Sequence, residues 1–200
     1  MRKDYKPITW DKLVLYEVKN GWTQGVDEMA KQFDHSREDL IMDKRLLFSK
    51  QNLWSGILFG VGLIAFLDEM LFHQLLHWHH FYDKSTTSIG LISDGLFHAF
   101  SWFATISGLF LFADLRRRHA VWLMRWWGGI FVGVGGFQLY DGIIQHKLMR
   151  IHQIRYVDNV LTYDVIWNVI ALAVLIAGLI LVRQASRGII GGGAASNEHA

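Results

Sequence analysis

The chain contains no cysteine, which excludes disulfide bonds, thiolate metal sites and cysteine nucleophiles. Its single proline, Pro7, lies near the N-terminus, so none of the later helices needs to be kinked by proline. Neither sign of charge dominates, and the formal net charge of +2 at pH 7 argues against a nucleic-acid partner. Apolar residues, in contrast, are abundant: 52% of the 200 residues are hydrophobic and 14% are aromatic. This composition is too apolar for an average soluble domain.

Four apolar stretches are each long enough to cross a bilayer, which requires about 20 residues in a helix. They cover residues 52–73, 89–112, 121–144 and 161–182. Short connections join the first stretch to the second and the third to the fourth, so each pair forms a tight hairpin. The sequence therefore predicts an all-α membrane protein of four transmembrane helices, arranged as two helical hairpins.

Segments of different composition flank the four spans. We expect residues 1–51, which are rich in charge, to form a cytoplasmic N-terminal tail that is partly helical. Residues 52–182 form the transmembrane domain, and residues 183–200, with their run of glycines, form a flexible C-terminal tail. The first apolar run begins near Leu53, too far along the chain for a secretory signal peptide.

The positions of Lys and Arg predict the orientation in the membrane. Three arginines fill the connection between the second and third spans at 116–118, whereas the first connection has only Lys84. Three basic residues in the third connection weaken this contrast. By the positive-inside rule, both termini lie in the cytoplasm and the first and third connections lie on the outer side of the membrane.

The second half of the chain repeats the first. A shift of 73 residues aligns Trp54 with Trp127, Gly56 with Gly129, Asp68 with Asp141, His73 with His146 and His79 with His152. A shift of 70 residues aligns Asp94 with Asp164 and His98 with Asn168. Because Asp, His and Trp are uncommon in spans, these matches indicate a duplication. We predict parallel repeats over residues 52–112 and 125–182, related by a pseudo-twofold axis along the membrane normal.

Acidic and histidine side chains gather near the predicted outer ends of the spans. Ionisable groups inside a membrane are costly and normally face a partner or a cavity. Carboxylates and imidazoles from facing helices are also how helical bundles hold metal ions, and they suit zinc, copper or iron. The candidate metal ligands are Asp68, Glu69, His73, Asp94, His98, Asp141, His146 and Asp164. A network of buried hydrogen bonds that orders the helices, or a proton relay, would use the same residues.

Helical spacing predicts which of these side chains share a face. Asp94 and His98 are i, i+4 neighbours, so we expect them to face the interior together with His73 and His146. Asp68 and His79 share a different face, and Asp141 and His152 repeat that pair. Taken singly, His77, His80 and His152 are interpreted as interfacial side chains.

Three sequence motifs resemble those of a known family. Residues 68–80 read D-E-M-L-F-H-Q-L-L-H-W-H-H, residues 93–98 read S-D-G-L-F-H, and residues 141–146 read D-G-I-I-Q-H. They resemble the D-G-I-x-x-H-x-x-L-x-x-H-H and D-G-L-F-H-A motifs of a bacterial membrane family, domain of unknown function 2243, over about residues 52–182. The family often has Gly at the position of Glu69, so the resemblance implies no role for Glu69. A loose association of the family with terminal-oxidase assembly points towards copper handling.

Three functional hypotheses follow. The first is an inner-membrane protein that binds a transition metal near the periplasmic face, in metal handling or respiratory oxidase assembly. The second is a membrane metalloenzyme, a hydrolase or oxygenase, that acts on a lipid-like substrate. The third is a haem-binding redox bundle with His73 and His146 as axial ligands. The expected surroundings are the lipid bilayer, and the sequence leaves open a membrane-protein partner, a homo-oligomer and catalysis itself.

Overall fold

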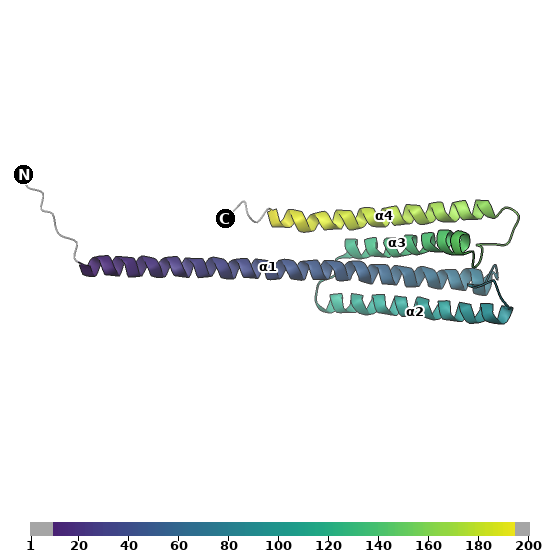
Figure 1. The fold of residues 1–200 in the computed structure, drawn as a ribbon, viewed down its shortest axis with the longest axis horizontal. Helices are drawn as coiled ribbons and strands as arrows, with labels where there is room; N and C mark the ends of the chain where they lie inside the picture. The colour runs from purple at the N-terminus through teal and green to yellow at the C-terminus, as the bar shows by residue number, and fades with distance from the viewer. Residues whose placement is uncertain (1–9, 195–200) are drawn as a thin grey trace, which may run out of the picture. The chain divides into compact units, whose positions relative to one another are not determined.

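The computed structural model of the chain describes the backbone of residues 10–194 and the side chains of residues 23–187 (Figure 1). The described residues form helices α1 (Trp10–Asp68), α2 (Thr87–Arg117), α3 (Leu123–Leu139) and α4 (Val160–Ala194). Two π-helical segments, η1 (Glu69–Leu75) and η2 (Tyr140–Met149), continue α1 and α3. The predicted all-α fold with four helices is confirmed.

The chain divides into two compact units, Met1–Leu46 and Leu47–Ala200. In the first unit, the described side chains are exposed on one continuous helix. The second unit contains the four-helix bundle. The predicted flexible C-terminal tail falls partly on α4, which continues to Ala194, while residues 195–200 lie outside the described residues, as do residues 1–9 of the N-terminal tail.

Three described helical stretches are long and apolar enough to cross a membrane: Thr23–Leu75, Thr87–Arg117 and Val160–Arg187. The remaining predicted span falls on α3 and the start of η2. With 17 residues at about 1.5 Å each, α3 is about 26 Å long, slightly less than the hydrocarbon core of about 30 Å. Because η2 directly continues the helix of α3, α3 and η2 together are long enough to complete a fourth crossing.

Glycines bring the two central helices into close contact. A Cβ atom at Gly60 of α1 would overlap the Ile130 carbonyl oxygen of α3, and Gly133 lies equally close to the α1 backbone. Gly108 similarly packs α2 against α1, and Gly178 packs α4 against α3. Small residues at such contacts are how membrane helices approach one another. Helices α1 and α3 therefore form the centre of the bundle, with α2 and α4 on its flanks (Figure 1).

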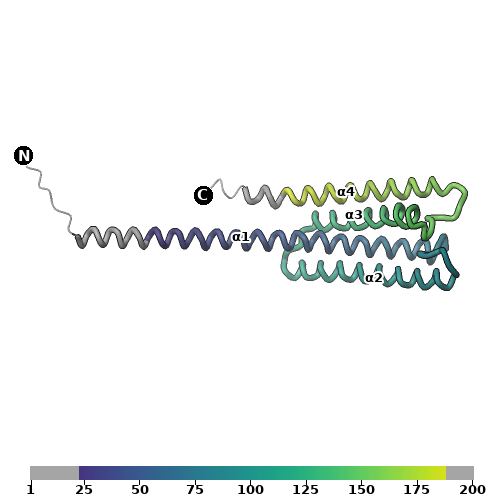
Figure 2. The backbone as a smooth tube through the Cα atoms, in the orientation of Figure 1, coloured from purple at the N-terminus to yellow at the C-terminus, as the bar shows by residue number. Residues whose placement is uncertain are grey.

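The two ends of the bundle have different connections. At one end, the turn between α2 and α3 is fixed by Asn52 of α1, whose side-chain oxygen accepts a 2.8 Å hydrogen bond from Trp122 N. The buried guanidinium of Arg125 ties α3 to α1 and α4 at the same end. The connections 76–86 and 150–159 meet at the opposite end (Figure 2), where Asp83 N donates to Ile151 O at 3.1 Å.

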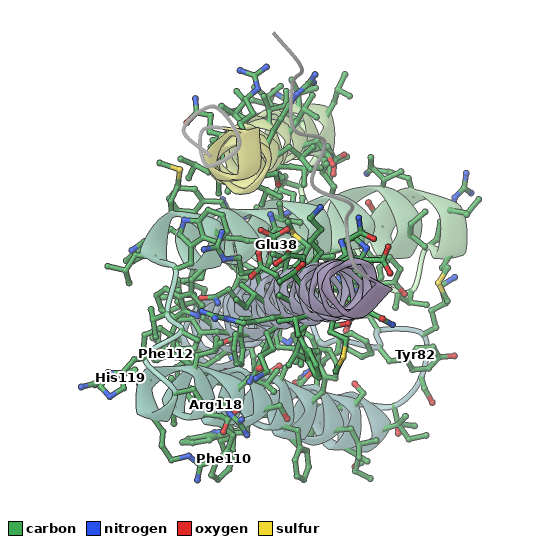
Figure 3. All side chains as sticks on the ribbon, turned by 90° about the vertical axis from the view of Figure 1, so that its left-hand side faces the viewer. Glu38, Tyr82, Phe110, Phe112, Arg118 and His119 are labelled. Carbon is green, nitrogen blue, oxygen red and sulfur yellow. The ribbon has the colours of Figure 1, made fainter. Side chains whose placement is uncertain are left out.

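Large apolar side chains cover the outside of the flanking helices. Phe110 projects away from α2 (Figure 3) and is 72% exposed. On α4, Leu161 and Val169 are also exposed. The nearby Phe112 instead packs against Trp126, with 4.5 Å between ring centroids. So much exposed apolar surface fits a lipid bilayer environment.

Candidate metal centre

The π-helical segments bring each central aspartate close to a histidine. Asp68 and His73 are five residues apart, as are Asp141 and His146. In an α-helix such residues point about 140° away from each other, whereas the π-helix, with its wider turn and i→i+5 hydrogen bonds, reduces this angle. His73 Nε2 accordingly lies 3.9 Å from Asp68 Oδ2, and His146 Nε2 lies 3.1 Å from Asp141 Oδ2.

Both π-helical segments end in the same left-handed reversal of the backbone. His77 has a φ of 50° and Arg150, its equivalent 73 residues later, has a φ of 52°. Matching hydrogen bonds close the two turns, from Trp78 N to Phe72 O at 2.8 Å and from Ile151 N to Gln145 O at 3.1 Å. Each reversal folds the following connection back over the end of the bundle.

The two connections deliver a second pair of histidines, His79 and His152, to the first pair. The rings of His79 and His152 stack with centroids 4.7 Å apart and planes 7° apart. His73 lies 4.6 Å from His79, and His146 lies 4.7 Å from His152, again between centroids. All four side chains are buried. These matching distances are what a twofold axis between the stacked rings would produce. We call these four residues the histidine cluster.

Hydrogen bonds at Nδ1 set the orientation of three of these rings. His79 Nδ1 donates to Ile154 O at 3.1 Å, and His152 Nδ1 donates to Phe81 O at 2.9 Å. A carbonyl oxygen only accepts, so Nδ1 carries the hydrogen and Nε2 of a neutral ring keeps its lone pair. His73 Nδ1 lies 2.6 Å from Glu69 Oε2, which has the same effect.

Three of the Nε2 atoms lack hydrogen bonds. Nε2 of His73, His146 and His152 is buried and makes no hydrogen bond in the part of the chain that the structure describes. The Asp141 carboxylate oxygens lie 3.1 Å from His146 Nε2 and 3.4 Å from His152 Nε2 without forming one. Burial lowers the pKa of His79 to about 2, and His152, His73 and His146 add to that shift. His79 is therefore neutral at physiological pH. Buried imidazoles beside carboxylates are the ligand set of a transition-metal site.

Two groups of three side chains have ligand atoms that all lie within 4.8 Å of one another. One group is Asp141, His146 and His152; the other is Glu69, His73 and Asp94. In the second group, the 2.6 Å between Glu69 and His73 is shorter than the separation of about 3 Å expected for two ligands bonded to one ion at about 2.0–2.1 Å. Glu69 is thus better placed to orient His73 than to bind metal beside it.

Asp94 and Asp164, equivalent in the repeat, have different partners. Asp94 accepts hydrogen bonds from His80 Nδ1 and Phe81 N, both at 2.7 Å, so it anchors the 76–86 connection. It also lies 3.4 Å from His73 Nδ1. Asp164 pairs with Lys147 instead. Of the predicted ligands, the structure gathers Asp68, Glu69, His73, Asp94, Asp141 and His146 around the histidine cluster.

His98 lies apart from this cluster, contrary to the predicted geometry. Its Nε2 accepts a 3.1 Å hydrogen bond from Trp102 Nε1, and its ring packs against Phe66. No hydrogen bond or ion pair joins His98 to Asp94 among the described residues, because the Asp94 carboxylate turns to His80 and the connection. Sharing a helical face was not enough to bring the two side chains together.

Sequence reasoning left His79 and His152 out of the proposed ligand set. The interfacial interpretation covered His152, and His79 entered only as a residue that shares a helical face with Asp68. The 73-residue shift had already aligned them with each other and with Asp68 and Asp141 on a common face. That alignment was the signal that could have identified them.

These features define an integral membrane protein of four helices with a buried His/Asp centre formed by two repeats. The model of a family described as predicted membrane protein, domain of unknown function 2243, matches residues 55–185, and the chain belongs to this family. All four residues of the histidine cluster fall within the match. The predicted family resemblance is thus confirmed. Searches of curated proteins and of solved structures gave no match.

Proposed function

We propose that this protein binds a transition-metal ion at the end of the bundle formed by the connections 76–86 and 150–159. The ligands are drawn from six side chains: His73, His79, His146, His152, Asp68 and Asp141. The observation that carries this proposal is the group of buried Nε2 atoms with no hydrogen-bond partner. Each unpaired buried polar atom costs about 1–3 kcal/mol, so several in one place favour a bound ligand.

Charge supports a cation. Asp68 and Asp141 are buried carboxylates at the end of membrane helices, where an uncompensated negative charge is costly. A divalent ion between them would balance both charges, and neutral imidazoles would complete its coordination. Zinc, copper and iron all accept such ligands.

Burial of the centre favours metal binding or transfer over catalysis. A catalytic metal site keeps an open coordination position for water or substrate. Here the four imidazoles and two carboxylates surround the centre, and each of these residues is at most 6% exposed. The proposed role is therefore metal handling, which includes supply of metal to a respiratory oxidase.

A haem-binding bundle is less well supported by the geometry. A haem held between His73 and His146 needs a flat slot between the two imidazoles. The rings of His79 and His152 occupy that region, at 4.6 Å and 4.7 Å from those of His73 and His146. The proposed location is the bacterial inner membrane, with both termini in the cytoplasm and the metal centre near the periplasmic face.

Metal content of purified variants tests this function. His152→Gln removes one ligand while keeping a polar side chain, and His98→Gln is the matched control because His98 lies outside the histidine cluster. Protein reloaded with zinc, copper or iron in detergent is analysed by elemental analysis. We expect stoichiometric metal in the wild type and His98→Gln, and a large loss in His152→Gln. Wild-type protein without stoichiometric metal, or equal loss in both variants, contradicts the proposal.

A further inference from the structure

An apolar cavity of about 350 Å³ lies beside the histidine cluster, where the end of α1 meets α3 and α4. Two residues that line the cavity also contact His79 of the cluster. The ring of Phe72, which lines the cavity, stacks on His79 with centroids 6.5 Å apart. Ile154, also in the lining, provides the carbonyl that accepts the His79 hydrogen bond. The proposed metal binding uses none of the space in this cavity.

The cavity opens towards the lipid. Ile166 and Ile170 of α4 line it and are 55% and 59% exposed on the outer surface of the bundle. In a membrane, this surface faces acyl chains rather than water. A ligand can therefore enter sideways from the bilayer, which restricts the occupant to lipid-soluble molecules.

One unpaired polar atom distinguishes this cavity from an ordinary lipid groove. Gln138 lines it, and its side-chain oxygen Oε1 is buried without a partner among the described residues. An amide oxygen only accepts hydrogen bonds, so it calls for a donor on the occupant. A hydrocarbon chain offers no donor and would leave this atom unsatisfied.

Aromatic side chains form one end of the cavity. Phe72 meets Trp167 edge-on with centroids 5.5 Å apart, and meets Trp78 at 5.1 Å. Such walls favour a planar aromatic ring, through offset and edge-to-face contacts. The volume falls at the lower end of the range of small-molecule sites, about 300–1,000 Å³.

We propose that this cavity binds a membrane-dissolved phenolic compound, such as a quinol, with its ring against Phe72, Trp78 and Trp167 and a hydroxyl group donating to Gln138. The inference goes beyond the metal function and does not depend on it. No electron transfer is part of it.

The test is binding of a hydroquinone bearing one isoprenoid unit to the detergent-purified full-length protein, measured by equilibrium dialysis under argon. We expect saturable binding, and at least tenfold weaker binding of the di-O-methyl ether, which has the same ring but no donor. Measurements on both metal-free and metal-loaded protein keep this result separate from that of the metal proposal, because binding is expected in both forms.

Three variants sharpen the test. Gln138→Leu removes the acceptor at similar volume and should raise the Kd about tenfold, whereas Val174→Phe fills the cavity and should abolish binding. Thr105→Val is the matched control, because Thr105 lines a separate cavity between α1 and α2 and should leave the Kd unchanged. Equal affinity for the hydroquinone and its ether, or no effect of Gln138→Leu, would mean that an acyl chain is the natural occupant and would overturn the proposal. Absence of saturable binding would overturn it too.

Discussion

Gly133→Ala should separate the two central helices. The added Cβ would overlap the Ile57 carbonyl oxygen and lie 3.0 Å from Val61 N, and both atoms belong to the α1 backbone. Ordinary carbon contacts are about 3.5–4.0 Å, so α1 must move by more than half an ångström. Overpacking of this kind typically costs about 1–3 kcal/mol of stability.

Gly136→Ala is the matched control on the same helix. A Cβ there meets no atom within 4 Å, so only the helix preference for alanine over glycine applies, about 1 kcal/mol in favour of the variant. Both variants gain this term, and it cancels in their comparison. Gly133→Ala should therefore be about 1–3 kcal/mol less stable than Gly136→Ala.

The assay is reversible unfolding in mixed micelles, followed by circular dichroism, with metal content measured in parallel. Helix displacement should also lower the metal content of Gly133→Ala, because ligands must stay within about 0.5 Å of their positions. Equal stabilities of the two variants would show that α1 and α3 do not approach as closely as described.

Three further predictions concern the metal centre and the orientation of the protein in the membrane. The pKa of His79 is lower in the folded than in the unfolded protein, so folding favours its neutral form, and its contribution to stability is present above the unfolded pKa of about 6.5 and is lost as the pH falls. Between pH 7.5 and 5.5 the metal-free protein should therefore lose about 1.4 kcal/mol of stability through this group. Thermal unfolding measures this loss, which should be absent from His79→Gln. Glu69→Gln should weaken metal binding about 10–100-fold in chelator competition, because His73 loses its carboxylate partner, and unchanged affinity would refute that role. Reporter fusions should be active in the periplasm at residue 85 and in the cytoplasm at residue 117, and the reverse pattern would invert the topology.

Hydropathy was sufficient to predict most of the bundle. The predicted spans 89–112 and 161–182 lie inside α2 and α4, because long apolar runs in a membrane must form helices to satisfy their backbone groups. The predicted span 121–144 instead starts just before α3 and ends within η2. A π-helical segment has no hydropathy signal, so its position could not be predicted by assuming a regular α-helix.

The assumption of a regular α-helix also limited the prediction of which site residues contact one another. Glu69 and His73, four residues apart, meet as i, i+4 neighbours on a helix do. The contacts between residues five apart, such as Asp141 and His146, required the wider turn. The left-handed residues His77 and Arg150 are not glycines, so nothing in their identity marked the reversals that bring His79 and His152 inwards.

The most direct test of the central claim is the X-ray absorption spectrum of the metal-loaded wild-type protein. Each repeat contributes two residues to the histidine cluster, so a centre with three or more imidazoles requires both repeats. For zinc we predict nitrogen and oxygen ligands at about 2.0–2.2 Å with the multiple scattering of at least three imidazoles. A spectrum with no more than one imidazole, or with only water-like oxygen ligands, would contradict a metal centre shared between the two repeats.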